Sequence, residues 1–342
     1  MTHAELVKHA LTTHLNEAMW QRLFSRPWID LFYGPSGSGK SATILEVIKQ
    51  MHKATGQVAR VWIGDGSRTT YQDSGLIEAG AIETCDYSHR PWPQTVTNQI
   101  CEGYWPEDGE NGPLVKRAAP HVGLYVFEGL SVMSRYLAGN IQGGLAEQAS
   151  RGIKLGESSP IMSVDLMTDA QGKYIDGSGP GTRVGGNPPT HYNIVQQHMM
   201  GAIRRCKGLA VPVIWTAHER QGEDKNQGDS VIAPEVFGKA LSAELSREFN
   251  HTLHFTLATK VGEKVDPTTG KKVKEGAAEY RIYTRDHYDP DGLVQTKYRA
   301  VTRVPPTRTQ VMPEYLTGRP GEAIRLFHCL IAEARAQFLQ ED

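Results

Sequence analysis

The sequence predicts an α/β fold with a mainly parallel sheet flanked by helices, and three observations predict it. Strand and helix patterns alternate along most of the chain, which is the order that a parallel sheet requires because its strands are joined by helical crossovers. The run 122–127 is apolar throughout, as in a strand covered on both faces. A glycine-rich loop at 34–41 lies between a strand pattern and a helix pattern.

Composition and charge limit the classes of protein to consider. The 342 residues are 39% hydrophobic and 22% charged, so a mainly disordered chain is excluded. The sequence lacks a signal-peptide pattern and any apolar run of about 18 residues, so we expect a cytoplasmic protein without a membrane partner. Its four cysteines lack metal-ligand spacing. No linker divides the chain, which favours one domain with insertions.

The N-terminal half alternates short β-rich runs, several ending near glycine, with segments whose apolar residues recur at helical spacing. The first helix belongs to an N-terminal segment, 1–27, that precedes a core at 28–318. The expected strands are 28–33, 58–63, 81–85 and 122–127. The expected helices are 4–24, 42–52, 93–101 and one beginning at Ser131.

The C-terminal half combines further α/β elements with two irregular features. Ten glycines and little periodicity mark 141–189 as an inserted loop or hairpin. An edge hairpin is expected within 251–285, because a turn signal centred on 266–270 separates two strand patterns. These strands are 251–259 and 279–283, after a helix at 190–207 and a strand at 211–216. A closing helix at 319–340 lies in the C-terminal segment 319–342.

The loop after the first strand matches the P-loop pattern, G-x-x-x-x-G-K-S/T. Its glycines let backbone N–H groups converge on phosphate oxygens, and the following helix adds its positive end. Lys40 neutralises phosphate charge and Ser41 offers a hydroxyl to Mg²⁺, so the motif predicts ATP and Mg²⁺ as cofactors. The expected nucleotide-binding residues are Gly34, Pro35, Ser36, Gly37, Ser38, Gly39, Lys40 and Ser41.

Two carboxylates follow predicted strands at the sheet edge where a nucleotide would lie. Glu128 follows an apolar strand, where an acid can hold magnesium directly or through water. We expect Asp65 to orient the attacking water, because ligands gather outside the carboxyl ends of parallel strands, although Asp-Gly is also a common turn pair. Glu128 is the competitor for that catalytic role, with Glu78 or Glu83 as a third choice.

His218 lies just beyond the predicted strand 211–216. A polar group there can sense the terminal phosphate by a hydrogen bond and convey its presence to the next loop. The alternative for His218 is a solvent-facing loop histidine.

With these residues in view, the chain resembles the RecA-like ATPases, and more closely compact phage-encoded nucleotide-binding proteins of recombination and single-strand annealing. Segments within 28–285 carry the resemblance: GPSGSGKS, LYVFEGLS, VPVIWTAHE, and PEVFGKAL followed by REFN. It implies a RecA-like P-loop NTPase core in which Lys40 and Ser41 hold phosphate and magnesium. Glu128 would be the Walker-B acid, where Asp is usual, with Asp65 as the water-orienting acid and His218 as the sensor.

The resemblance implies a Mg²⁺-dependent ATPase that forms a ring or filament and acts on DNA in phage recombination or replication. A phage DNA-packaging or assembly motor and a non-hydrolysing structural nucleotide binder are the alternatives. Because RecA-like sites lie at subunit interfaces, a basic residue from a neighbouring subunit could complete the site. The residues considered for this role are Lys239, Arg281 and Arg285.

Single-stranded DNA is the expected polymer, but the loop that contacts DNA in RecA is acidic here. Segment 219–230 has four acids against two bases, a net charge that repels phosphate. Segment 260–310 has eleven Lys/Arg against seven Asp/Glu, a local charge of +4. Its hairpin turn is either a solvated tip or a DNA-contacting arm. The lysines there are Lys264, Lys271, Lys272 and Lys274.

Overall fold

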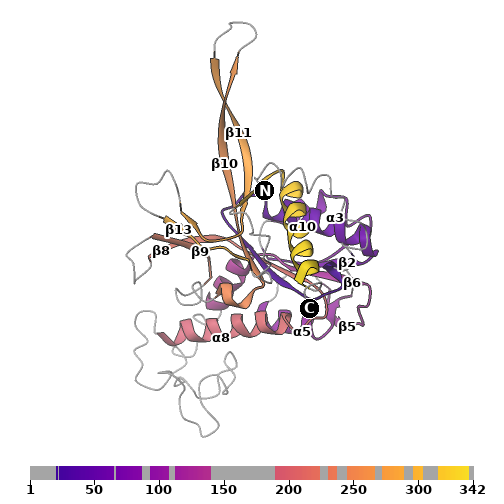
Figure 1. Cartoon of the computed structure of the whole chain (residues 1–342). Helices are drawn as coiled ribbons and strands as arrows, with labels where there is room; N and C mark the ends of the chain where they lie inside the picture. Colours follow the sequence, from indigo (N-terminus) through magenta and orange to yellow (C-terminus); the bar gives the residue numbers. More distant parts are fainter. Residues whose placement is uncertain are drawn as a thin grey trace.

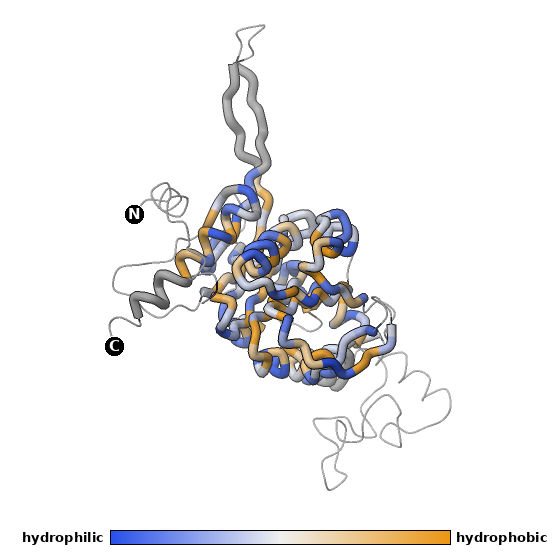
Figure 2. The backbone as a smooth tube through the Cα atoms, turned by 90° about the vertical axis from the view of Figure 1, so that its right-hand side faces the viewer, coloured by the Kyte–Doolittle hydropathy of each residue, from blue (hydrophilic) through white to orange (hydrophobic). Residues whose placement is uncertain are grey.

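A three-layer arrangement of helix, sheet and helix forms the body of the protein in a computed structural model (Figure 1). Seen at a right angle, apolar segments run through this body (Figure 2). The structure describes residue 21 and the ranges 23–64, 67–86, 93–107, 112–139, 189–223, 230–236, 245–265, 272–288, 296–302 and 315–338.

The main sheet confirms the predicted α/β class. Its strand order is β15-β11-β10-β1-β7-β6-β2-β3, with β14 paired to β10. All neighbours from β10 to β3 pair in parallel, whereas β11, β14 and β15 pair antiparallel at one side. This arrangement is consistent with a RecA-like core. The parallel strands are β1 (Ile29–Tyr33), β2 (Val58–Ile63), β3 (Ile82–Asp86), β6 (Val122–Phe127), β7 (Val213–Ala217) and β10 (His251–Val265).

Different helices cover the two faces of the sheet, and successive side chains of a strand pack against opposite faces. In β6, Leu124 and Val126 join the cluster that contains α3 (Lys40–Thr55) and α10 (Pro320–Phe338). The intervening Tyr125 and its neighbour Phe127 join the opposite cluster. The helices in that second cluster are α5 (Pro93–Cys101), the segment 130–139 and α8 (Pro189–Cys206). The strand is therefore apolar at successive positions because both of its faces are covered.

The edge hairpin is present, but the predicted bounds of its strands, 251–259 and 279–283, were too short. β10 pairs with β11 (Lys272–Tyr283) continuously from His254↔Tyr283 to Val265↔Lys272. The strands therefore extend through most of the expected turn, since antiparallel pairing satisfies their backbone groups. Figure 1 shows this hairpin projecting well beyond the body.

Several short elements were not predicted. α4 (Arg68–Gln72) follows β2, and β4 (Tyr104–Pro106) pairs with β5 (Leu114–Lys116). The remaining elements form a second sheet, the far edge of the main sheet and a short 3₁₀ turn. They are β8 (Glu219–Glu223), β9 (Ser230–Pro234), β12 (His287–Tyr288), β13 (Thr296–Tyr298), β14 (Val301–Thr302), β15 (Tyr315–Gly318) and η1 (Leu245–Glu248).

Two sequence predictions fall largely outside the described residues. Of the helix expected at 4–24, residues 21, 23 and 24 are described, and they are helical. The insertion expected at 141–189 lies outside, except for the first residue of α8. Within the described ranges, the chain has no helix with the length and apolar character needed to cross a bilayer.

Buried histidines lie where the hairpin meets the second sheet. The His254 ring is fully buried and stacks on Tyr298 and His287 at centroid distances of 4.8 and 5.3 Å. Burial lowers the pKa of His254. The hydrogen bond between its Nε2 and the Glu219 carboxylate, at 2.9 Å, raises the pKa but does not outweigh burial. Burial and the neighbouring His254 lower the pKa of His287 to about 3. The His287 ring is therefore neutral in the folded protein at mildly acidic pH, and burial disfavours the charged form of His254 as well.

We expect the free energy of unfolding to fall as pH drops below about 6.5, the ordinary histidine pKa. Below that value the histidines bind protons more readily in the unfolded chain than in the folded protein. Each histidine therefore lowers the free energy of unfolding by up to about 1.4 kcal/mol per pH unit. His287→Phe keeps a stacking ring and removes one titrating group. Urea unfolding at several pH values between 4.5 and 7.5 should therefore give a shallower pH dependence for this variant. Parallel curves for variant and parent would contradict the assignment.

Candidate functional site

The glycine-rich loop joins β1 to α3 at the carboxyl edge of the parallel strands. Gly34 has φ +152°, and a Cβ there would lie 2.1 Å from the carbonyl oxygen of Phe255 on β10. No side chain fits at this position, so the close approach of β10 explains the first glycine of the motif. Gly39, at φ +88°, then turns the backbone into α3, which begins at Lys40.

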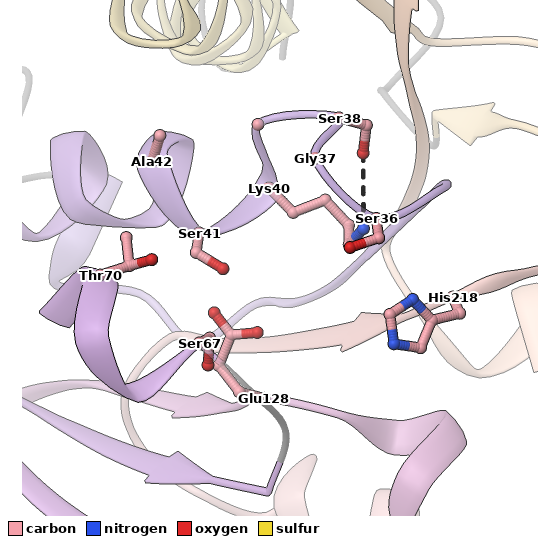
Figure 3. Close-up of a pocket in the computed structure, with 11 residues that line it drawn as sticks. Ser36, Gly37, Ser38, Lys40, Ser41, Ala42, Ser67, Thr70, Glu128 and His218 are labelled. Atoms are coloured by element: carbon pink, nitrogen blue, oxygen red, sulfur yellow. Dashed lines mark hydrogen bonds between the residues drawn. The ribbon is translucent and has the colours of Figure 1, made fainter.

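The Lys40 ammonium is held over the loop. It donates to the carbonyl oxygens of Gly34 and Pro35 at 2.9 and 2.8 Å and to the Ser38 hydroxyl at 3.4 Å (Figure 3). The first turn of α3 contains no acidic residue, so the helix dipole and the ammonium act together on one region. This region is suited to an anion such as phosphate.

Glu128 is the buried acid of the site, with its side chain 2% exposed. Its backbone N–H donates to the carbonyl oxygen of Trp62 at 2.8 Å, which ties the end of β6 to β2. Thr216 donates its hydroxyl to Oε2 at 2.7 Å, and the Tyr71 hydroxyl donates to Oε1. Figure 3 shows the carboxylate facing Ser41 across the space below the loop.

A cavity of about 440 Å³ lies where these elements meet (Figure 3). Its walls come from the loop and the first turn of α3, from the start of α4, and from the ends of β6 and β7. The described lining residues are Ser36, Gly37, Ser38, Gly39, Lys40, Ser41, Ala42, Ser67, Thr70, Glu128 and His218. Lys40 is the one lysine or arginine among these described residues, so it is their main source of positive charge for a polyphosphate.

The donor chemistry of this cavity fits magnesium held together with a nucleotide. Ser41 supplies a hydroxyl and Glu128 a carboxylate, both hard oxygen ligands. The described residues contain no cluster of three or more His, Cys, Asp or Glu side chains that could bind a metal alone. Mg²⁺ commonly takes one or two protein ligands and completes its shell with phosphate and water, so two oxygen donors are sufficient.

His218 follows β7, and Figure 3 shows its imidazole beside the loop at the end of the cavity. Its backbone is fixed on both sides. The His218 N–H donates to the Ser131 hydroxyl at 2.8 Å, and the Glu235 N–H donates to the His218 carbonyl at 2.6 Å. The Ser131 hydroxyl in turn donates to the Glu235 carbonyl at 2.6 Å. These bonds connect the position of His218 to the end of β9 in the second sheet.

The structure brings together Lys40, Ser41, Glu128 and His218, which come from three separate segments of the sequence. Asp65 lies outside the described residues, as do Lys239 and Lys271. Lys264, Lys272 and Lys274 lie on the described strands of the hairpin.

The two arginines suggested for a neighbouring subunit's site do not line this cavity in the part of the chain that the structure describes. Arg281 donates to Glu279 at 3.0 Å and lies over the Tyr315 ring at 5.2 Å. Arg285 follows β11 and is exposed.

Sequence reasoning missed Ser67, Thr70 and Tyr71, because α4 is only five residues long and has no periodicity that predicts a helix. Thr216 was visible as a polar residue at the end of a strand, but its contact with Glu128 depends on the pairing of β7 with β6.

No protein-family model matches this sequence, and no curated protein matches it. Among solved structures, the chain is similar to the crystal structure of flagellar accessory protein FlaH from Methanocaldococcus jannaschii. The two are 9% identical, and the match covers 79% of this chain and 84% of that chain with a TM-score of 0.38. A similarity this distant carries no conclusion about activity, and the fold class rests on the chain's own strand order.

Proposed function

We propose that this chain is a Mg²⁺-dependent RecA-like ATPase that acts on DNA in phage recombination or replication. The observation that carries the proposal is that Lys40, Ser41, Glu128 and His218 line the same cavity. An anion-binding loop, a hydroxyl, a buried carboxylate and an imidazole at adjacent strand ends supply groups that phosphoryl transfer to water uses to bind phosphate and magnesium.

Each group has a distinct task in this proposal. The loop N–H groups and Lys40 bind the phosphates, and Lys40 exchanges its bonds to loop carbonyls for bonds to phosphate oxygens. Ser41 and Glu128 would hold Mg²⁺, which neutralises phosphate charge when bound. Asp65 orients the attacking water, with Glu128 as the competing carboxylate. His218 contacts the terminal phosphate and reports it to the second sheet.

The proposed DNA contact is the projecting hairpin. The β8–β9 segment beside the site is acidic, with four acids against two bases in 219–230. The hairpin lies in the net-basic segment 260–310 and stands away from the body (Figure 1). We further propose a homo-oligomer in which Lys239, Arg281 or Arg285 of one subunit completes the site of the next.

ATP turnover by the purified chain, measured with Mg²⁺ and with or without single-stranded DNA, tests the proposed function. We expect hydrolysis that depends on Mg²⁺ and rises with DNA. ATP binding without turnover would instead identify a structural nucleotide binder. Turnover without binding to DNA at low salt would remove the DNA role and favour an assembly or packaging motor.

Replacing the four hairpin lysines at 264, 271, 272 and 274 by serine should lower affinity for single-stranded DNA and flatten its salt dependence by up to about four phosphate contacts. ATP turnover without DNA should stay near that of the parent. Fluorescence anisotropy at several salt concentrations measures both quantities. The double variant Lys272→Ser/Lys274→Ser should lose more affinity than Lys49→Ser/Lys53→Ser, which removes equal charge from α3. Equal affinities would make the hairpin an inert tip.

A further inference from the structure

Two buried hydroxyls from separate elements hold the Glu128 carboxylate, one on each oxygen. The Tyr71 hydroxyl, from α4, donates to Oε1, and the Thr216 hydroxyl, from β7, donates to Oε2 at 2.7 Å. Tyr71 is 0% exposed and Thr216 is 1% exposed, so water does not compete for either bond. Hydrogen bonds from hydroxyls to a carboxylate are among the stronger hydrogen bonds in proteins.

The direction of the Thr216 bond is fixed by a third group. The Gly129 N–H donates to the Thr216 hydroxyl oxygen at 2.8 Å. Because a hydroxyl has one proton and its oxygen accepts here from Gly129, that proton is committed to Glu128. The same backbone segment is anchored by the Glu128 N–H bond to Trp62. Glu128 is thus fixed at its backbone N–H and at both carboxylate oxygens.

These contacts fix a carboxylate that also belongs to the nucleotide cavity. Glu128 lines the cavity, and Figure 3 shows it facing Ser41. The buried hydroxyls therefore lock its rotation, so that the carboxylate would meet a metal or its water shell in one fixed orientation.

We propose that Tyr71 and Thr216 are positioning residues that aim the Glu128 carboxylate at the magnesium–nucleotide site. The proposal rests on the proposed function. Tyr71 has a second effect, because Ser67 and Thr70, at the start of the same segment, line the cavity wall opposite the loop. Its bond to Glu128 therefore connects this wall to the acid.

The test compares Tyr71→Phe and Thr216→Val, which keep nearly the same volume and each remove one hydroxyl. Binding of Mn²⁺, as a probe for Mg²⁺, is followed by electron paramagnetic resonance with a non-hydrolysable ATP analogue. We expect Mn²⁺ affinity to fall about 10-fold in either variant, within the 10–100-fold range for the outer-shell partners of metal ligands. Turnover should fall by a similar factor, with the KM for ATP changing less than about threefold.

Matched variants separate positioning from general damage. Thr216→Ser keeps the hydroxyl and should restore Mn²⁺ affinity and turnover. Tyr136→Phe removes a hydroxyl from an exposed tyrosine and should match the parent. If Thr216→Val does not fold, Tyr71→Phe, which keeps the aromatic ring, decides the question.

The two proposals fail differently. A parent chain that binds neither the ATP analogue nor Mn²⁺ would overturn the proposed function, and this proposal with it. A parent that binds both and turns over ATP, with Tyr71→Phe and Thr216→Val indistinguishable from it, would overturn the positioning role alone. Equal losses in the valine and serine variants of Thr216 would also overturn it, because the hydroxyl would then be irrelevant.

Discussion

Lys40→Ala is expected to reduce ATP turnover by roughly 10³-fold or more, because it removes the charge that stabilises the transferring phosphoryl group. No other lysine or arginine stands among the described residues that line the cavity, so nothing there replaces the lost charge. Folding should survive. Lys40 is partly exposed at the first position of α3, and its bonds to the carbonyls of Gly34 and Pro35 can pass to water.

Nucleotide binding and turnover of Lys40→Ala should be measured beside those of Lys49→Ala. Lys49 is exposed on the same helix, so this variant removes an equal charge from α3 without touching the cavity. We expect Lys49→Ala to match the parent and both proteins to show parental circular dichroism. Near-normal turnover in Lys40→Ala would show that the P-loop is not the active site.

Much of the site could be predicted because its signals are local. The P-loop is a contiguous motif in which each glycine has a backbone reason, and Gly34 shows that reason in its contact with Phe255. Glu128 and His218 come directly after strands, and parallel strands bring their carboxyl ends to one edge. Placing Glu128 and His218 at the site therefore needs only the strand assignments, and the predicted bounds of β6 and β7 are close to the observed ones.

The remainder depends on contacts between segments that the sequence does not relate. Tyr71 reaches Glu128 from 57 positions away, and Thr216 from 88. A tyrosine in a five-residue helix and a threonine in an apolar strand carry no local sign of those bonds. The length of β10 and β11 was underestimated for a related reason. Their outer pairs mix polar and apolar residues without a core pattern, so the sequence predicts shorter strands than the structure has.

Glu128→Gln and Asp65→Asn are expected to impair turnover in different ways. At Glu128 the amide offers one acceptor oxygen and one NH₂ group, yet both Tyr71 and Thr216 donate to the carboxylate. One hydroxyl must then face a donor, which disturbs the side chain as well as removing its charge. We expect turnover about 100-fold slower and a higher Mg²⁺ concentration for half-maximal activity.

Asp65→Asn should instead leave ATP·Mg²⁺ binding near the parental value while turnover falls about 100-fold, the scale of a lost general base. Calorimetric binding of a non-hydrolysable ATP analogue at several Mg²⁺ concentrations, set beside single-turnover rates, separates the two effects. Asp73→Asn serves as the control, because Asp73 is an exposed carboxylate at the end of α4 that does not line the cavity, and it should behave as the parent. A turnover defect confined to Glu128→Gln would transfer the water-orienting role to Glu128. The two hydroxyls on that carboxylate would then orient the base itself, and Thr216→Val would lower turnover even at saturating Mg²⁺.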